Sequence, residues 1–277
     1  MKRLPHARDP EVVESLARPA VILFDWHATL VDTHDAMYAA MDDMLPQLDA
    51  LGLVARLLAP EASKTPEDAR LLEYVREHRQ LHPKIRAERR VSRSDLFEIL
   101  FGHDDRAKHA AHLVFNVCYR NHFGEVHPLG GEERGTLRAL RSAGITLGLL
   151  SNREREFLDH ELAVVEGGSW RELFDVVVGG GDVTRRKPAP DSLLLALGRL
   201  GIPSPPGPEN WYVGDSTTDV ATAKRAGVTS VFFNGAGWED AWLDRYFPGN
   251  AAYPHVPDVV VRDFREFAEL CARCLGR

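Results

Sequence analysis

The 277-residue chain lacks most features that mark secreted, membrane-bound or nucleic-acid-binding proteins. Its three cysteines are too few and too scattered for a disulfide framework. No apolar run approaches the roughly 18 residues that span a bilayer, and the charged N-terminal stretch is unlike a signal peptide. The net charge of -7 provides no general basic surface for a nucleic-acid backbone. These absences favour a cytoplasmic protein that binds neither membranes nor nucleic acids.

Two of the three cysteines, Cys271 and Cys274, form a lone C-x-x-C near the C-terminus. A structural metal site needs a second pair of Cys or His ligands, and no such pair accompanies this motif in the sequence. Incidental thiols on a terminal helix are therefore favoured over a metal or redox site.

The sequence alternates between short apolar runs and helical patterns. Such alternation indicates crossover units, a parallel sheet and helices on both of its faces. We therefore predict an α/β fold, a Rossmann-like three-layer sandwich. The predicted strands are 20–25, 145–150, 175–179, 211–214, 229–233 and 258–261, and the predicted helices are 132–142, 154–165, 191–200, 219–226 and 263–275.

One long interval, directly after the first strand, breaks this alternation. Residues 33–128 contain helical patterns at 36–45, 66–78, 93–100 and 107–123 and no convincing strand. We interpret the interval as an inserted α-helical domain, with residues 1–32 and 129–277 forming the Rossmann-like core. Segments 31–35 and 124–131 would connect the two parts as hinges. The alternative is a set of extra helices packed on the sheet.

Polar residues follow the apolar runs at widely separated positions. Asp25 ends the first predicted strand, Ser151-Asn152 ends the second, and Gly214-Asp215 ends the fourth. The carboxyl ends of strands in an open α/β sheet converge on one crevice. Lys187, one of only six lysines, lies between the last two of these strands. Two carboxylates, a lysine and a hydroxyl in one pocket suit a Mg²⁺-assisted displacement at phosphorus.

In this order, the four segments resemble the motifs of the haloacid dehalogenase-like hydrolase superfamily over nearly the whole chain. The usual first motif of that family is Asp-x-Asp-x-Thr/Val, whereas this chain has Asp25-Trp26-His27-Ala28-Thr29. His27 thus stands where the phosphatases of the family have their second aspartate. The resemblance also implies that the inserted helices form a cap domain, which would shield a reactive acyl phosphate from water.

The resemblance implies a nucleophile and a metal site. Asp25 would attack phosphorus and form an aspartyl phosphate. The Mg²⁺ ligands would be Asp25, Asp215, the backbone carbonyl of His27, and Asp219 directly or through water. Gly214 would let the backbone approach the ion closely. The same acidic residues also have a simpler interpretation, because Asp25 or Asp219 could cap a following helix.

The remaining motif residues would bind and neutralise the phosphoryl group. Ser151 and Asn152 would form an anion cradle at a helix start, although the pair could equally be an ordinary cap. Lys187 would hold Asp25 and offset phosphoryl charge, and Thr29 would support the turn near the nucleophile. The neighbouring Arg185 and Arg186 are expected to face water.

Three hypotheses compete for His27. It could serve as the acid/base of a phosphatase, because imidazole transfers protons near neutral pH. Alternatively, Asp25-Trp26-x-x-Thr29 resembles phosphonoacetaldehyde hydrolases, in which a cap lysine forms a Schiff base; Lys84 would be the candidate here. The third hypothesis is a non-catalytic relative that retains a Mg²⁺ and phosphate pocket.

A small phosphate ester is the expected partner. The interval from His82 to Arg93 is locally basic and could receive an anionic substrate, with Lys84, Arg86 and Arg90 as candidate contacts. Since arginine is abundant throughout the chain, these residues could also belong to an ordinary solvated face.

Overall fold

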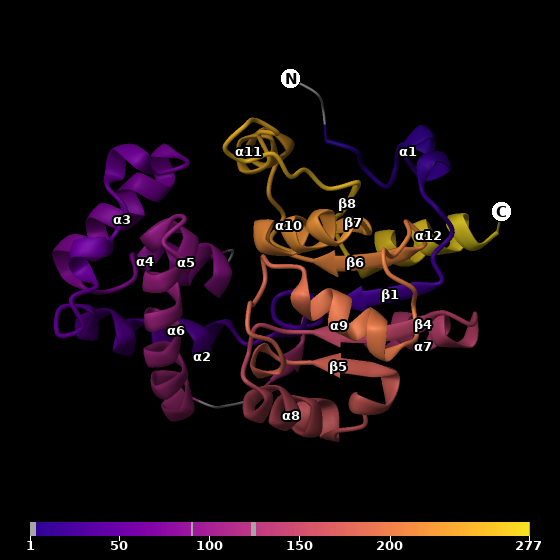
Figure 1. The fold of residues 1–277 in the computed structure, drawn as a ribbon, viewed down its shortest axis with the longest axis horizontal. Coiled ribbons are helices and arrows are strands. Elements are labelled where there is room, and N and C mark those ends of the chain that lie inside the picture. Colours follow the sequence, from indigo (N-terminus) through magenta and orange to yellow (C-terminus); the bar gives the residue numbers. More distant parts are fainter. Residues whose placement is uncertain (1–3, 90, 123–125, 277) are drawn as a thin grey trace. The chain divides into compact units, whose positions relative to one another are not determined.

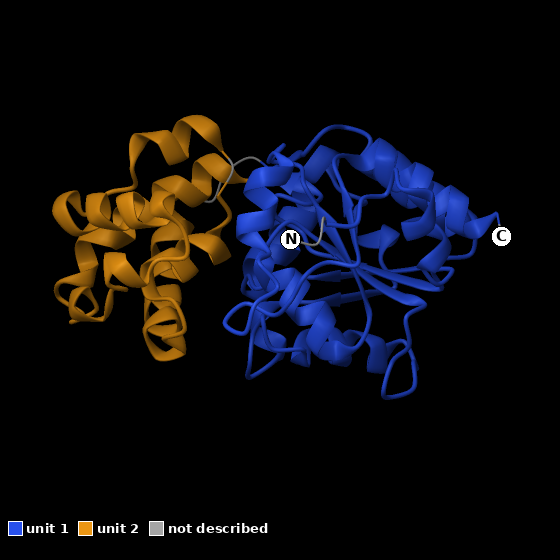
Figure 2. Cartoon of the chain, turned by 90° about the horizontal axis from the view of Figure 1, so that it is seen from above, with its two compact units in different colours: residues 1–32, 126–277 blue, residues 33–125 orange. Residues whose placement is uncertain are grey.

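The computed structural model describes residues 4–89, 91–122 and 126–276. They divide into two compact units, residues 1–32 with 126–277 and residues 33–125, shown in blue and orange in Figure 2. The second unit begins at Thr33 and the first resumes at Val126 rather than 129. The first unit resumes before the predicted residue 129 because His127–Pro128 pairs with Val31–Asp32, which also belongs to the first unit.

The first unit contains a six-stranded parallel sheet (Figure 1), which confirms the predicted α/β class. Its strand order is β5-β4-β1-β6-β7-β8. The sheet is built from β1 (Val21–Phe24), β4 (Thr146–Leu150), β5 (Val176–Val178), β6 (Asn210–Gly214), β7 (Thr229–Phe233) and β8 (Val259–Val261). All six predicted strands are present within one or two residues at each end, because these strands are buried on both faces and appear as continuous apolar runs.

Helices cover both faces of this sheet. Side chains alternate along β1, so that Ile22 and Phe24 contribute to one core cluster while Val21 and Leu23 contribute to another. The first cluster includes side chains from α1 (Pro10–Ser15), α7 (Glu133–Ser142), α8 (Arg155–Val164) and α12 (Phe264–Leu275). The second includes side chains from α9 (Asp191–Arg199) and α10 (Thr217–Ala226). The result is the predicted three-layer sandwich.

The C-terminal helix α12 carries Cys271 and Cys274, both buried. Burial, followed by the proximity of Cys274, raises the pKa of the Cys271 thiol well above its ordinary value. A buried thiol with a raised pKa is a poor nucleophile and metal ligand. These cysteines therefore serve as core residues of the first unit.

The second unit is helical throughout its described part, with no strand among residues 33–89 and 91–122. Its helices are α2 (His34–Met44), α3 (Pro66–His78), α4 (Pro83–Glu88), α5 (Arg93–Phe101) and α6 (Asp105–Tyr119). Helices α2 and α6 pack together, and α5 packs against both α3 and α6. The predicted helix 107–123 ends at Tyr119, where one 3₁₀ turn, Arg120–His122, follows.

Two short α-helices and one small ribbon lie outside the sequence predictions. Helices α1 and α4 have only six residues each, too few to show a helical period. Helix α11 (Asp240–Tyr246) falls in the stretch 238–257, which the sequence predicts as a long loop or a short helix. The ribbon pairs β2 (Val31–Asp32) antiparallel with β3 (His127–Pro128). It lies where the chain leaves and re-enters the first unit, within the segments that we interpreted as hinges. Residues 124 and 125 of those segments lie outside the described part. No described helix is long and apolar enough to cross a membrane.

Candidate active site

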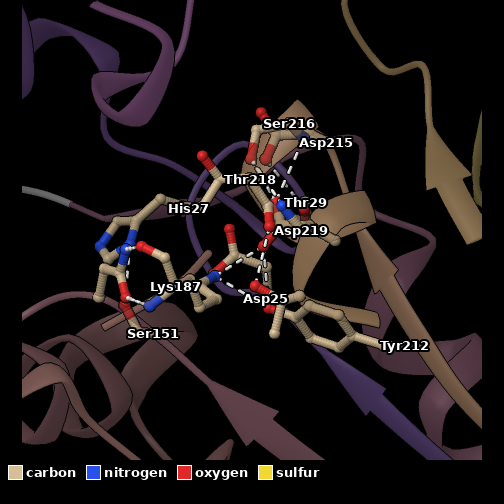
Figure 3. Close-up of polar contacts among 12 residues, drawn as sticks. Asp25, His27, Thr29, Ser151, Lys187, Tyr212, Asp215, Ser216, Thr218 and Asp219 are labelled. Carbon is tan, nitrogen blue, oxygen red and sulfur yellow. Dashed lines mark hydrogen bonds and ion pairs between the residues drawn. The ribbon is translucent and has the colours of Figure 1, made fainter. Parts of the chain in front are cut away.

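The polar residues that follow β1, β4 and β6 meet at the carboxyl edge of the sheet (Figure 3). Strand β1 lies between β4 and β6, and the register pairs Phe24 with both Leu149 and Val213. The chain connections diverge on either side of β1, which makes this point the topological switch of the sheet. Asp25 is the next residue after β1, and its amide donates to the carbonyl of Val213 (2.8 Å).

A buried ion pair forms the centre of the site. The Nζ atom of Lys187 lies 2.7 Å from Oδ1 of Asp25 and 2.7 Å from Oδ1 of Asp219. Burial raises the pKa of Asp25 to about 6, although Lys187 opposes that shift. Burial alone would lower the pKa of Lys187, but Asp219 and Asp25 together raise it above its ordinary value. One cation therefore holds two carboxylates in a desolvated pocket.

Asn152 fixes the chain at Lys187. The side-chain amide of Asn152 donates to the carbonyl of Lys187 (3.0 Å), and its oxygen accepts from the Lys187 amide (3.0 Å). Two reciprocal hydrogen bonds anchor this loop more firmly than one would. The predicted phosphate contact of Asn152 remains a prediction that would have to use its remaining side-chain N–H or its main chain.

Tyr212 was not identified from the sequence, because it lies within the apolar run of β6. Its hydroxyl accepts from Lys187 Nζ (2.8 Å) and donates to Asp219 Oδ1 (2.9 Å). Burial and the neighbouring carboxylates, Asp219 before Asp25, raise the pKa of Tyr212 well above its ordinary value. The phenol is therefore a neutral group that links the lysine to the second aspartate.

Three carboxylates could hold a cation here. Oxygen atoms of Asp25, Asp215 and Asp219 lie within 4.8 Å of one another. Oxygen donors of this kind are what Mg²⁺ prefers, and it commonly retains several waters. The residues present therefore fit the divalent cation that the sequence predicted.

Asp219 is already engaged in hydrogen bonds. Oδ1 accepts from Lys187 and Tyr212, while Oδ2 accepts from the amide (3.2 Å) and hydroxyl (2.6 Å) of Ser216. Four donors occupy all the acceptor positions of a carboxylate, so Asp219 could contact a metal ion, directly or through water, only by exchanging one of these donors. Helix α10 begins at Thr217, two residues before the predicted start, with Ser216 as N-cap and Asp219 completing the capping box.

Gly214 makes room for Asp219. A Cβ atom at position 214 would lie 2.4 Å from Cγ of Asp219, so any side chain there would displace the carboxylate. Our interpretation that Gly214 lets the backbone approach a metal ion remains a prediction, and the contact with Asp219 is an additional reason for glycine at this position.

A tight turn after Asp25 presents the next two polar side chains. Trp26 accepts hydrogen bonds from the amides of Leu30 and Val31, and Ala28 has a φ of 57°. Thr29 donates to Oδ1 of Asp215 at 3.4 Å, so that it links the turn to the second carboxylate rather than to the nucleophile.

His27 bridges two elements of the site. Its Nδ1 lies 3.4 Å from Oγ of Ser151. The same hydroxyl oxygen accepts a hydrogen bond from the amide of Arg153 (3.1 Å). Its Nε2 lies 2.7 Å from Oε2 of Glu161. Glu161 belongs to α8 and is fully buried. It was not identified from the sequence, because an acidic residue within a helix usually marks the solvated face.

The two arginines before Lys187 differ in their surroundings. Arg185 is largely exposed and pairs with Asp191, as expected. Arg186 does not face water as predicted, because it donates to the carbonyl of Asn152 (2.8 Å) and pairs with Glu154. It therefore supports the same loop as Asn152.

The two candidate substrate contacts of the second unit that the structure describes have partners within that unit. Lys84 is half-exposed, with Nζ 3.5 Å from Glu67 and 3.7 Å from Glu88. Arg86 pairs with Asp42. Arg90 lies outside the described residues. A Schiff-base lysine is typically desolvated, and the surroundings of Lys84 do not provide this.

Comparison with known proteins shows which family and which relatives this chain is similar to. A family model described as haloacid dehalogenase-like hydrolase matches residues 19–227. The phosphoglycolate phosphatase of Escherichia coli (strain K12) is 30% identical over 219 residues, covering 76% of this chain and 79% of that protein.

Two solved structures share the fold. A Had-superfamily hydrolase from Ehrlichia chaffeensis has a TM-score of 0.52 and 19% identity, covering 94% of this chain and all of that one. CbbY from Rhodobacter sphaeroides, solved with phosphate, has a TM-score of 0.51 and 20% identity, covering 91% and 96%. At these identities, the structural likeness concerns the fold alone.

Proposed function

The chain belongs to the haloacid dehalogenase-like hydrolase family, and we propose that it hydrolyses a small phosphate monoester with Mg²⁺ through an aspartyl-phosphate intermediate. It is a phosphatase similar to phosphoglycolate phosphatases. The observation that carries the proposal is the contact of 2.7 Å between Lys187 Nζ and Asp25 Oδ1 at the switch point of the sheet. That contact holds Asp25, one of the three clustered carboxylates, at the edge of the sheet that also carries Ser151.

In the first step, a carboxylate oxygen of Asp25 attacks phosphorus, and the bond from phosphorus to the ester oxygen breaks. The departing oxygen takes a proton from His27. Ser151 and Lys187 contact the transferring phosphoryl oxygens and offset their charge, which is the main form of catalysis in phosphoryl transfer.

In the second step, water gives a proton to His27 and attacks phosphorus. The bond between Asp25 and phosphorus breaks, phosphate leaves, and both side chains return to their initial state. A bound Mg²⁺, held by Asp25, Asp215 and the main-chain carbonyl of His27, with Asp219 through water, would neutralise phosphoryl charge.

The substrate proposal rests on the relatives. The E. coli relative is named for phosphoglycolate, a small anionic ester, and we infer that this chain accepts a substrate of the same class. Lys84, Arg86 and Arg90 remain the proposed contacts in the second unit, where Arg86 would have to exchange Asp42 for substrate.

We expect the purified protein to hydrolyse at least one small phosphate ester in Mg²⁺. The assay is phosphate release from a panel of esters that includes phosphoglycolate. Chelation should abolish turnover and added Mg²⁺ should restore it, because the clustered carboxylates repel one another and the phosphate without a cation. Turnover that survives chelation would contradict the metal proposal, and no turnover of any ester would contradict the phosphatase proposal.

Replacing His27 with Ala tests the acid/base role. Proton donation matters most when the leaving oxygen is strongly basic, so kcat for alkyl phosphates should fall by roughly 10²- to 10⁴-fold. The leaving group of an activated aryl phosphate departs without a proton, so the rate of enzyme phosphorylation by that ester should fall much less. Steady-state and burst kinetics on both esters provide the comparison. Equal decreases in the rates of enzyme phosphorylation by the two esters would exclude the general-acid role.

A further inference from the structure

Glu161 is a buried carboxylate with two specific donors. Its Oε2 accepts from Trp26 Nε1 at 2.9 Å and lies 2.7 Å from His27 Nε2. The side chain is 0% exposed. Burying a carboxylate is costly unless it is hydrogen-bonded or paired, so this arrangement is specific to the residues that surround it.

The position of Glu161 is fixed from the core side. Trp26 is fully buried and makes an edge contact with the ring of Trp170, with centroids 5.6 Å apart. The indole N–H points to the same carboxylate oxygen as the histidine. Glu161 therefore has a defined location even without His27, and the histidine ring docks against it.

The orientation of His27 follows from this contact. In its ionised form Glu161 accepts hydrogen bonds and cannot donate one, so that form requires the shared proton to lie on Nε2 of the ring. The other nitrogen, Nδ1, then lies on the side of Ser151, at 3.4 Å. One ring nitrogen faces a buried carboxylate and the other faces the expected phosphate cradle.

We propose that Glu161 is the positioning residue of His27: it fixes the ring so that Nδ1 is the nitrogen that exchanges protons with substrate and water. The pair thereby takes the place of the carboxylate that family phosphatases have at position 27. Carboxylates orient catalytic and metal-binding histidines in the same way in other enzymes. This inference rests on the proposed function.

The variant that tests the proposal is Glu161→Met, which keeps the approximate size of the side chain. It removes the single oxygen, Oε2, that both Trp26 Nε1 and His27 Nε2 contact. The His27 ring then loses the partner that fixes its orientation. We expect kcat for alkyl phosphates to fall by roughly 10²- to 10⁴-fold, with KM changed far less. The rate of enzyme phosphorylation by an activated aryl ester should be nearly unchanged.

The control is Trp170→Phe, which alters the ring packed against Trp26 and leaves both contacts of Glu161 Oε2 in place. It should lower thermal stability and preserve the ratio of the alkyl to the aryl rate. If Glu161→Met lowers both rates equally, or neither, Glu161 is only a structural partner and the proposal is overturned. Failure of the proposed function itself is distinguishable, because the wild-type protein would then hydrolyse neither ester.

A second measurement does not depend on any variant folding. Nitrogen-15 NMR of the wild-type protein, recorded with the His27 ring neutral, should show the proton on Nε2 and not on Nδ1. The opposite tautomer would overturn the proposal.

Discussion

Asp25→Asn should lose at least about 10⁴-fold in kcat/KM on every ester that the wild-type protein accepts. The amide has nearly the shape of the carboxylate but is a much weaker nucleophile, and removal of a covalent nucleophile costs losses of this order in other hydrolases. Steady-state kinetics with the wild-type preparation measured in parallel gives the ratio. Activity within tenfold of wild type would exclude Asp25 as the nucleophile.

The same variant should remain as stable as the wild type, or become more stable, in metal-free buffer at neutral pH. Burial raises the pKa of Asp25 from 3.8 to about 6, so the folded state binds this proton more tightly than the unfolded chain does. The contribution of Asp25 to the free energy of unfolding therefore decreases as the pH rises from about 4 through 6. Asparagine carries no charge and removes that cost. Thermal unfolding at several pH values checks the sign.

Lys187→Met should destabilise the protein by about 3–5 kcal/mol, because removing one partner of a buried ion pair leaves the other charge uncompensated. Here two carboxylates, Asp25 and Asp219, would share a desolvated pocket without the cation that lies between them. Turnover should also fall, since the lysine no longer holds the nucleophile. Urea unfolding in chelator measures the stability without a metal ion substituting for the ammonium.

Tyr212→Phe is the matched control for the lysine. It removes the hydroxyl bonds of 2.8 and 2.9 Å to Lys187 and Asp219 but leaves all three charges in place. The expected loss is about 1–3 kcal/mol, the cost of unpairing a buried hydrogen-bond partner. If Lys187→Met lowers the free energy of unfolding by no more than Tyr212→Phe does, the ion pair does not stabilise the site.

The sequence predicted the strand ends well because their signal is local. Asp25, Ser151 and Asp215 each follow an apolar run, and the topology of a parallel sheet brings such positions to one edge. The resemblance to a family supplied Lys187, which follows no strand and carries no local signal. The structure places all four within the first unit, where Lys187 contacts Asp25 directly.

The residues that sequence reasoning missed depend on tertiary contacts. Tyr212 and Glu161 belong to a strand and a helix whose local patterns are ordinary, and their importance appears only where Lys187, Trp26 and His27 meet them. A capping box was visible in Ser216-Thr217-Thr218-Asp219 and could have set the start of α10 correctly.

His27 stands where the usual first motif of the resembled family has an aspartate. A histidine there has a longer reach than aspartate, and the structure shows what accommodates it: a buried glutamate on α8 and a hydroxyl at the end of β4. The substitution therefore comes with its own supporting contacts. These contacts favour a histidine that is adapted to acid/base catalysis over the loss of that catalytic role.

The most direct test of the account is chemical trapping of phosphorylated Asp25. Enzyme mixed with an activated phosphate ester and Mg²⁺ is quenched in acid, reduced with borohydride and digested for mass spectrometry. The account predicts homoserine in place of Asp25, in an amount that increases when His27→Ala slows the second step. Reduction at another carboxylate, or none at Asp25 despite a burst of released alcohol, would contradict it.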